Sequence, residues 1–534
     1  MRIQPKTLLA IACPLLLLFA AACIQWALLG LPLLPSIQSV SAVPGTPHGF
    51  PAWLRITHYV NFLFIILLIR SGLQILVEHA RLYWNVHCTP NTEWLRLTPV
   101  KVPTDRVWTA NEDARYLSPW IGLPGGRKTV GMARHWHFLS VLFWVVNGAT
   151  FVALLFATDQ WKRLVPTSWQ ILPDAWAVFV HYATFHLPPE PNSFYAYNAL
   201  QQLTYFGVVF VLAPLAILTG PSMSPALTSR YGWYPKLPLN RQIGRSLHFL
   251  VMCCFVVFIL MHVSLVIASG FARNMNHIVM GTDTTKPMGL YLGIVGIAVI
   301  VGINALAHLL AWKRPRLIQH AAKAVVSPVM SVLLNHAASQ AEFSRKDISP
   351  FFWANGKIPT CGEWRALSAS QYKNYRLKVY GCIENPVELS LDDLRAMGEK
   401  SQVTLHHCIQ GWSGIAEWGG LQVADLVKLV QPKPAAGAVV FYSFGDGAEG
   451  GEFYDSLSME NALRPQTILA YDMNSAPLTD LHGAPLRLRV ENQLGFKMVK
   501  WIRAIEFVEC IAEVNEGEGG YKEDREYFGE LANI

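Results

Sequence analysis

The first part of the chain is marked by recurring apolar runs, and polar positions separate them. The runs have about 20 residues each, which is enough for a helix to cross the hydrocarbon core of a bilayer. They lie near residues 8–31, 53–76, 136–157, 198–220, 246–269 and 288–312. Pro14 and Pro214 fall inside two of them, which membrane helices tolerate. The pattern therefore predicts an N-terminal all-α transmembrane bundle of six spans.

The pattern changes near residue 313. From about residue 346 short alternating runs such as "YRLKVYG" and "PLRLRVEN" stand between Gly-rich turns, which predicts a mixed α+β domain. We divide the chain into an anchor span with its outer loop (1–50), a membrane domain (51–312), a linker (313–345) and a soluble domain (346–534).

Composition supports a membrane protein. Of the 534 residues 52% are hydrophobic and only 15% are charged, whereas soluble domains have about 25% charged residues. The net charge of +7 is spread among loops and forms no basic stripe, which argues against a nucleic-acid partner. The first run begins like a secretory signal, but it is longer than a usual signal core and no clear cleavage site follows. We expect an uncleaved anchor.

Lysine and arginine predict the orientation. Residues 77–135 contain eight of them, and residues 221–245 and 313–323 contain four each. The alternate segments contain none in 32–52, two in 158–197 and two in 270–287. By the positive-inside rule both termini are cytoplasmic, and so is the soluble domain. We expect a multi-pass protein of the bacterial inner membrane.

Two histidines in the fifth span carry the first chemical hypothesis. His248 and His262 are 14 residues apart, so they lie on nearly the same helix face about 21 Å apart. An ionisable group within a span is costly and indicates function. Neutral imidazole is an iron ligand, and electron-transfer haems take two axial ligands.

Histidines on other spans match those two depths. His58 lies near the outer end of the second span, level with His262. His135 and His137 lie at the inner end of the third span, level with His248. We prefer His137 because it repeats the Arg-x-x-His spacing that precedes His58. The sequence thus predicts two b-type haems, held by His58 with His262 and by His137 with His248.

These residues, with the stretches "RITHYVNFLFIILLIRSG" and "QLTYFGVVFVLAPLAILTG", resemble the four-helix cytochrome b subunits of respiratory formate dehydrogenases and nickel–iron hydrogenases. The resemblance covers about residues 50–270 and implies a four-helix dihaem core that exchanges electrons with quinone or quinol. The chain differs by one additional span on each side of this core. His308 in the last span is a weaker candidate for a quinone or proton site.

In the soluble domain the densest phrase is "VTLHHCIQGWSGIAEWGG". A lone cysteine is commonly a small buried residue, but the thiolate of Cys408 would also suit molybdenum or zinc. Zinc is disfavoured because His406 and His407 do not complete a site of the usual spacing.

A second phrase, "LHGAPLRLRVENQLGFKMVKWIRAIEFVE", concentrates positive charge. It can be a solvated strand face or an anion clamp, since arginine and lysine bind phosphate. The nucleotide fingerprints GxGxxG and GxxxxGK[ST] are absent from the sequence. The basic residues are Arg487, Arg489, Lys497, Lys500 and Arg503.

Together these phrases resemble the sulfite-oxidase family of molybdopterin domains over about residues 348–510, and within it the methionine-sulfoxide reductase catalytic subunits. The resemblance implies an α+β fold of sulfite-oxidase type, with Cys408 as the protein ligand of molybdenum. It implies cofactor contacts at Phe352, Trp353, Ser443, His482, Arg487, Met498, Val499 and Lys500.

The combined reading is a molybdopterin-dependent oxidoreductase, in which two haems connect quinone with a small oxo-substrate. We favour reduction of an S- or N-oxide. His407 stands where sulfite-oxidising relatives keep an arginine, and we assign it, and more weakly Tyr454, to the substrate pocket. The alternatives are a sulfite dehydrogenase that reduces quinone and a non-catalytic electron conduit. The sequence leaves open whether the chain forms a homodimer.

Overall fold

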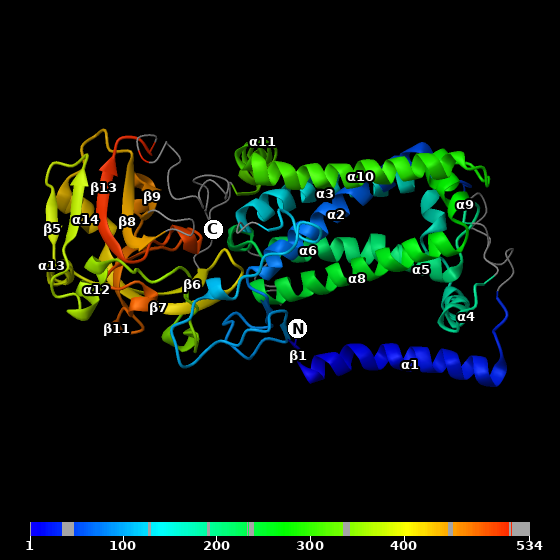
Figure 1. The fold of residues 1–534 in the computed structure, drawn as a ribbon, viewed down its shortest axis with the longest axis horizontal. Coiled ribbons are helices and arrows are strands. Elements are labelled where there is room, and N and C mark those ends of the chain that lie inside the picture. The colour runs from blue at the N-terminus through cyan, green and yellow to red at the C-terminus, as the bar shows by residue number, and fades with distance from the viewer. Residues whose placement is uncertain are drawn as a thin grey trace.

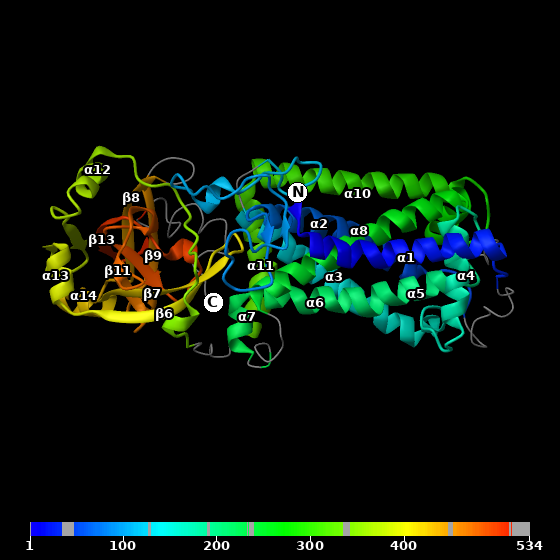
Figure 2. The same ribbon diagram turned by 90° about the horizontal axis from the view of Figure 1, so that it is seen from below.

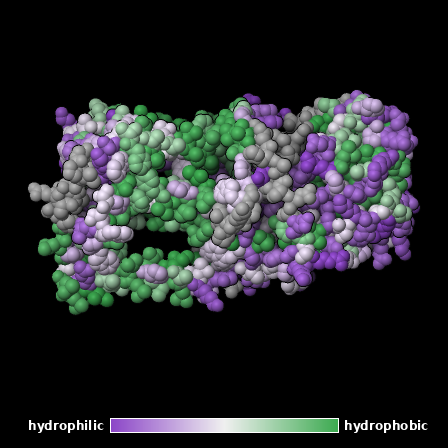
Figure 3. Space-filling model, turned by 180° about the vertical axis from the view of Figure 1, so that it is seen from behind, coloured by the Kyte–Doolittle hydropathy of each residue, from purple (hydrophilic) through white to green (hydrophobic). Residues whose placement is uncertain are grey.

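The computed structural model has a bundle of long helices at one end and a β-rich body at the other (Figure 1). It describes residues 2–34, 47–126, 130–188, 193–231, 233, 240–334, 342–446, 452–511 and 514. The surface of the helical part is largely hydrophobic, whereas the β-rich part is largely hydrophilic (Figure 3).

Six helical segments of the described residues are long and apolar enough to cross a membrane. They are α1 Pro5–Leu29, α2 Ala52–Val77, α3 Val130–Ala157, the continuous segment Ala199–Ser222, α8 Arg241–Ala268 and α10 Met288–Lys313. The fourth comprises α5 Ala199–Gly207, a π-helical turn Val208–Leu212 and α6 Ala213–Ser222. The six predicted spans are confirmed within a few residues at most ends, and the chain is a multi-pass membrane protein.

Shorter helices complete the helical end of the molecule. The predicted linker contains a 20-residue helix, α11, which lies across the end of α10 (Figure 2). The sequence shows no strong signal there because Pro328 lies inside the helix and its apolar positions are spaced by small residues. The shorter helices of this end are α4 Ile171–Ala183, α7 Pro225–Arg230, α9 Phe271–Met275 and α11 Pro315–Leu334.

The segment between α2 and α3 folds into a platform at the end of the bundle nearest the β-rich body. Its strands β2 Arg81–Leu82 and β3 Leu95–Arg96 form a small sheet with β1 Arg2–Ile3. A buried ion pair between Arg81 and Asp113, with atoms 2.8 Å apart, ties the segment together. The Arg81 guanidinium also contacts Glu93 at 3.0 Å. Buried ion pairs thus stabilise the platform. The sequence pattern of a loop does not predict such pairs.

The soluble domain contains two five-stranded sheets. The first has the order β11-β10-β7-β6, with β12 also pairing with β10, and the second has the order β5-β4-β13-β8-β9. The first contains β6 Lys400–His407, β7 Ser413–Gln422, β10 Thr467–Met473, β11 Ala476–Pro477 and β12 Arg487–Val490. The second contains β4 Leu377–Gly381, β5 Val387–Leu389, β8 Ala438–Asp446, β9 Glu452–Ser458 and β13 Ile502–Val508.

Short helices flank these sheets, and a continuous apolar core fills the space between them. The helices are α12 Gly362–Ala369, α13 Leu391–Ala396, α14 Val423–Val430 and α15 Met459–Ala462. The predicted strand phrases became β4 and β12, whose side chains include the core residues Leu377, Val379 and Leu488. The α+β class is therefore confirmed.

The soluble domain rests on the platform and on the first turn of α8. Trp353 donates its indole N–H to the carbonyl of Cys88 at 2.6 Å. The backbone N–H of Ala110 bonds to the carbonyl of Ala354 at 2.8 Å. An apolar cluster continues across this seam. The two domains therefore meet in a buried interface.

Candidate functional site

The four histidines predicted to bind haem lie in the bundle as two facing pairs. His58 of α2 faces His262 of α8, with ring centroids 6.3 Å apart. His137 of α3 faces His248 of α8, also with centroids 6.3 Å apart. Because α8 begins at the soluble domain and runs away from it (Figure 1), the pair with His248 is the near pair and the pair with His262 is the far pair.

The separation within each pair fits one metal ion between the two rings. An imidazole nitrogen binds a metal at about 2 Å. The ring centre lies about 1 Å behind that nitrogen, so two imidazoles on opposite sides of one iron have centroids about 6 Å apart. The observed value in both pairs agrees with this expectation. The donor set therefore fits axial ligation of a b haem.

Hydroxyl groups orient the rings. Ser71 donates its hydroxyl proton to a carbonyl of its own helix at 2.7 Å, and its oxygen lies 3.0 Å from His137 Nδ1. Thr219 likewise donates its hydroxyl proton to a carbonyl of its own helix at 2.7 Å, and its oxygen lies 2.9 Å from His248 Nδ1. Each oxygen can therefore accept a bond from Nδ1–H, which leaves Nε2 unprotonated for a metal. In the far pair Tyr205 Oη lies 3.4 Å from the Nδ1 of the α8 histidine.

Glycines stand beside the near pair. A Cβ at Gly72 would lie 3.5 Å from the His137 ring, and a Cβ at Gly220 would lie 3.8 Å from the His248 ring. The nearest atom in both cases is Cε1, so a hydrogen in place of Cβ leaves space beside the ring edge that adjoins Nε2.

The geometry separates the two histidines of the third span. His135 is buried and its Nδ1 lies 2.8 Å from the carbonyl oxygen of Gly131, one turn earlier in α3. Two residues in a helix differ by about 200°, so His135 cannot face α8 together with His137. We therefore retain His137 as the candidate ligand.

His308 lies on α10, outside the three helices that carry the two pairs. Its ring centroid is 6.2 Å from that of Trp312 on the same helix. Its Nδ1 is buried and has no hydrogen-bond partner among the described residues. The structure does not bring it to either pair, and its role stays a prediction.

Cys408 lies at the start of the tight connection between β6 and β7. The strands pair up to His407 and Ser413, and the intervening residues 408–412 form the cysteine loop. The Cys408 N–H bonds to the Trp412 carbonyl at 3.1 Å, and its carbonyl accepts from Gly411 N–H at 3.1 Å. Cys408 is 3% exposed, and burial raises the pKa of its thiol to about 12. Metal binding would have to displace this proton, as thiolate ligation requires.

The first turn of α8 holds the cysteine loop. Arg241 donates to the carbonyl of Cys408 at 2.9 Å and to that of Trp412 at 3.3 Å. Gln242 donates to the carbonyl of Gly411 at 2.9 Å. The helix that bears His248 and His262 is thus bonded directly to the candidate molybdenum ligand.

The hypothesis of a five-residue anion clamp is too broad. Three of its five basic residues are neutralised by carboxylates inside the soluble domain. The pairs are Arg489 with Glu491 at 2.8 Å, Lys497 with Asp455 at 2.6 Å, and Arg503 with Glu452. Charge density alone does not reveal the pairs with Asp455 and Glu452, because both carboxylates lie on β9, whereas Glu491 follows Arg489 by two residues and was a local signal.

Arg487 and Lys500 have no carboxylate within salt-bridge distance in the described part of the chain. Arg487 donates to the carbonyl of His482 at 2.8 Å. Lys500 donates to the carbonyls of Asn355 and Leu481. Burial lowers the pKa of both side chains, because a charge without a counter-ion is costly in a low dielectric. Two such cations fit the phosphate of a bound pterin.

Three other predicted cofactor contacts lie beside this pair. His482 Nε2 is 3.3 Å from the carbonyl oxygen of Phe352, and burial lowers the pKa of His482 to about 4. The Phe352 ring lies 5.9 Å from the ring of Trp412 in the cysteine loop. Ser443 donates to the carbonyl of Lys500 at 2.7 Å. Phe352, Ser443, His482, Arg487 and Lys500 therefore form one connected group next to the cysteine loop.

The remaining predicted contacts are placed differently. Trp353 is directed to the platform through its bond to Cys88. Met498 and Val499 put their side chains into the apolar core. Val499 also uses its backbone groups internally, at 2.8 Å to Leu488 and 3.1 Å to Lys497. Contacts from these three residues stay predictions from resemblance.

The two residues assigned to the substrate pocket have different surroundings. His407 Nδ1 lies 3.5 Å from Arg241 Nη1, and burial, followed by this arginine, lowers its pKa. Tyr454 lies on the edge strand β9, where it packs with Ala438 and Val440. Tyr454 belongs to the second sheet and is not brought to the cysteine loop, so we drop it as a pocket residue.

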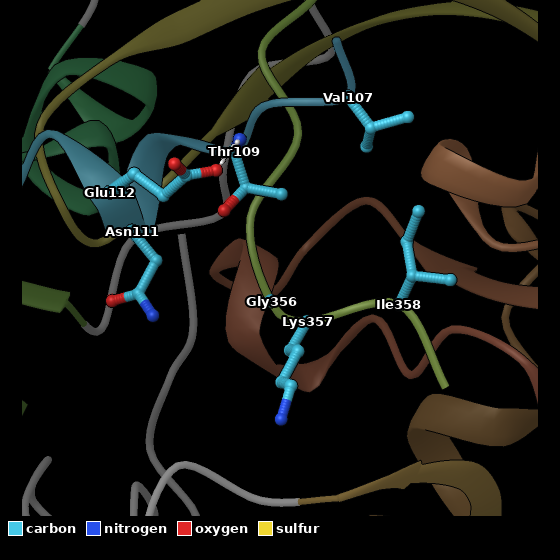
Figure 4. A pocket seen from close by; sticks show the side chains of 7 residues that line it. All are labelled: Val107, Thr109, Asn111, Glu112, Gly356, Lys357 and Ile358. Atoms are coloured by element: carbon cyan, nitrogen blue, oxygen red, sulfur yellow. Dashed lines mark hydrogen bonds between the residues drawn. The ribbon is translucent and has the colours of Figure 1, made fainter. Parts of the chain in front are cut away.

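A cavity of 380 Å³ opens at the seam between the platform and the soluble domain (Figure 4). Beside it, the rings of Trp108 and Trp353 lie 5.3 Å apart in the apolar cluster that includes Cys408. The cavity is therefore lined by the platform on one side and by the segment after Trp353 on the other. Its lining residues are Val107, Thr109, Asn111, Glu112, Gly356, Lys357 and Ile358.

Sequence reasoning missed the residues that the membrane domain contributes to the seam. A single sequence gives no reason to pair these residues with a motif about 170 to 320 positions away, so they look like ordinary loop or span-end residues. They are Arg241, Gln242, Cys88 and Trp108. The only available signal was the polar phrase "NRQIGR" before the fifth span. We used its arginines only as positive charge that predicts a cytoplasmic loop.

Comparison with protein families matches both halves of the chain. Residues 49–281 match prokaryotic cytochrome b561, and residues 365–513 match the oxidoreductase molybdopterin-binding domain. The first match includes all four paired histidines and excludes α1 and α10. The second includes Cys408 and the connected group except Phe352. The two matches imply Mo-molybdopterin and b-type haem as cofactors.

Individual relatives each match part of the chain. A provisionally named protein-methionine-sulfoxide reductase subunit, YedZ1 of Azospira oryzae, is 35% identical over 29% of this chain and 54% of its own. The protein-methionine-sulfoxide reductase catalytic subunit MsrP of Xanthomonas campestris pv. campestris is 30% identical over 28% of this chain and 49% of its own. The chain thus spans about half the length of these curated relatives.

Among solved structures, the sulfane dehydrogenase SoxCD of Paracoccus pantotrophus is similar over 26% of this chain and 39% of its own. The identity is 22% and the TM-score is 0.23. A likeness of this extent carries no argument about function.

Proposed function

Because the chain joins a prokaryotic cytochrome b561 domain to an oxidoreductase molybdopterin-binding domain, we propose that it is a membrane-bound molybdenum oxidoreductase. It takes electrons from quinol, passes them through two b haems and reduces an S- or N-oxide. The observation that carries this proposal is the placement of α8. That helix bears one histidine of each pair, and its first turn is bonded to the cysteine loop.

The residues of the bundle have separate tasks in this proposal. The histidine pairs hold one iron each, and the hydroxyls of Ser71 and Thr219 keep Nε2 of the near pair free to bind it. The two positions on α8 are about 21 Å apart along the axis, so electrons can cross the apolar layer in two stages. His248 follows Arg241 by seven residues, about 10 Å of helix. The near pair is therefore close to the cysteine loop.

The soluble domain holds the second cofactor. Bound Mo-molybdopterin supplies two-electron oxygen-atom transfer. Cys408 supplies a thiolate, and Arg487 and Lys500 neutralise the pterin phosphate. The rings of Phe352 and Trp412, which meet edge to face, exclude water beside the cysteine loop, which strengthens each charge interaction there.

The substrate is an oxide whose oxygen accepts hydrogen bonds. Two relatives named as methionine-sulfoxide reductase subunits support reduction of a sulfoxide. His407 is positioned beside Cys408 with its ring close to Arg241, so an N–H donor stands next to the loop. Sulfite oxidation and a non-catalytic conduit are the competing functions.

One experiment separates these functions. The full chain is purified in detergent and its molybdenum and haem are counted. In one series the haems are reduced and a sulfoxide or an N-oxide is added, and in a second series the haems are left oxidised and sulfite is added, while the haem bands are recorded. We expect about one molybdenum and two haems per chain, and rapid haem reoxidation by a sulfoxide or an N-oxide.

Cys408→Ser is the matched variant. It is expected to retain both haem bands and lose the reoxidation, because the bundle does not depend on the thiolate. Haem reduction by sulfite would assign the dehydrogenase function instead. A wild-type chain that contains haem and no molybdenum would leave only the conduit.

A further inference from the structure

The first two turns of α8 present three polar side chains to the seam, and each has a different target. Arg245 donates to carbonyls of the platform and of α2, including Arg81 at 2.8 Å and Leu76 at 3.1 Å. Gln242 and Arg241 reach the opposite wall, which is the cysteine loop. Arg245 thus fixes α8 to the membrane domain, and the other two fix the soluble domain to α8.

Arg241 is a cation whose partners are all in or beside the cysteine loop. Its donors reach the carbonyls of Cys408 and Trp412 and approach His407 Nδ1. No carboxylate of the described residues lies within salt-bridge distance of it. An uncompensated charge in a buried seam is costly unless an anion completes the site. Cys408, whose backbone carbonyl accepts from Arg241, carries a thiol that becomes an anion when it binds a metal.

We propose that Arg241, contributed by the haem-bearing helix, is a positioning residue of the molybdenum site that raises the reduction potential of the metal held by Cys408. A fixed positive charge stabilises the more electron-rich state of a nearby centre. The membrane domain thereby completes the site of the soluble domain and favours electron flow from the near haem towards molybdenum. This inference rests on the proposed function.

Gln242 supplies a matched control on the same helix turn. It bonds to the Gly411 carbonyl at 2.9 Å and to the Ser413 hydroxyl at 3.1 Å, so it holds the same loop without a charge. If the role of Arg241 were to hold the loop alone, loss of the Gln242 contacts would have the same consequence. The two residues can therefore separate charge from mechanical attachment.

The test compares Arg241→Gln, Arg241→Lys and Gln242→Ala in the full chain. Each variant is titrated electrochemically, with the Mo(V) signal followed by electron paramagnetic resonance and the haems by absorbance. We expect Arg241→Gln to shift the molybdenum midpoint potentials downward, while Arg241→Lys and Gln242→Ala stay close to wild type. With a sulfoxide that wild type reduces, we expect kcat of Arg241→Gln to fall about tenfold or more with KM little changed.

Unchanged molybdenum potentials in Arg241→Gln, or an equal shift in Gln242→Ala, would overturn the inference. If Arg241→Gln fails to retain molybdenum, retention in Arg241→Lys supports the role of charge, and loss from both with retention in Gln242→Ala assigns Arg241 to attachment only. A wild-type chain without molybdenum or without oxide reduction would instead refute the proposed function.

Discussion

At the scale of single residues, the hydroxyls of Ser71 and Thr219 decide what the near histidine pair can bind. Each hydroxyl gives its own proton to a helix carbonyl, so its oxygen is available only as an acceptor for the imidazole. A ligand imidazole that donates from Nδ1 is a stronger electron donor to iron. These hydroxyls should therefore tune the haem as well as orient its ligands.

Replacing Thr219 by the isosteric valine tests this tuning. Without the acceptor 2.9 Å from His248 Nδ1, the imidazole becomes a poorer donor and ferric iron is less stabilised. We expect both haems to remain, with an upward shift in the midpoint potential of one of them in a spectroscopic redox titration. Thr204→Val is the control, because Thr204 bonds only to a carbonyl of its own helix. A downward shift or an unchanged potential would contradict the assignment.

Lys500 predicts a pH dependence of the cofactor-free chain. Burial lowers its pKa, whereas an unfolded lysine titrates near about 10.4. Between these values the unfolded chain binds more protons than the folded one, so stability rises with pH up to about 10 and is lowest below the folded pKa. We expect the melting temperature of the soluble domain in cofactor-free chain to rise from neutral to alkaline pH.

Lys500→Met should flatten that rise and weaken retention of the cofactor, because it removes both the buried charge and the anion partner. Lys357→Met is the control, since Lys357 is exposed in the same domain. The measurement is thermal unfolding at several pH values, with the molybdenum content of cofactor-loaded protein alongside. The same slope in wild type and Lys500→Met would show that Lys500 does not cause the pH dependence.

At the scale of elements, the sequence was most informative where a pattern is local. Each span is a single apolar run, so its length and limits follow from its own residues. Strands β4 and β12 likewise alternate within their own phrases. Helix α11 was missed because Pro328 and small residues weaken its pattern, and packing against α3 and α10 compensates.

The candidate site could likewise be predicted only where its signals are local in the sequence. The spacing of His248 and His262, and the phrase around Cys408, are local signals. The clamp was overestimated because Asp455 and Glu452 neutralise two of its members through tertiary contacts, and the neighbouring Glu491 neutralises Arg489. Arg241 was missed because its target is reached only when the two domains dock.

The cysteine loop makes an element-scale prediction at Gly411. Its φ is +112°, and a Cβ there would lie 3.2 Å from the Arg245 guanidinium carbon. Gly411→Ala therefore adds about 1–2 kcal/mol of backbone strain and a steric conflict with α8. We expect loss of molybdenum and full retention of haem, measured by metal analysis and absorbance.

Gly398→Ala is the matched control for that variant. Gly398 has φ +115°, but a Cβ there meets no atom within 4 Å. It should suffer the same backbone strain and keep its molybdenum. Equal metal loss in both variants would mean that strain, and not the contact with α8, disturbs the loop.

At the scale of the whole molecule, docking of the domains bears on orientation in the membrane. The soluble domain is bonded to the platform and to the first turn of α8. These are the segments in which lysine and arginine are concentrated, together with the region after α10. The chain therefore collects its positive loops and its soluble domain at one end of the bundle (Figure 1).

From the positive-inside rule we expect that end to lie in the cytoplasm. We expect a reporter that is active only in the periplasm to be silent when fused at the C-terminus, and a fluorescent protein that matures in the cytoplasm to be bright. A fusion in the loop between α9 and α10, near residue 284, should give the opposite result because it lies at the other end of the bundle. An active periplasmic reporter at the C-terminus would reverse the orientation. That result would mean that the folded, cofactor-loaded domain lies outside the cytoplasm, although the most positive loops precede it. The near histidine pair would then be the outer pair.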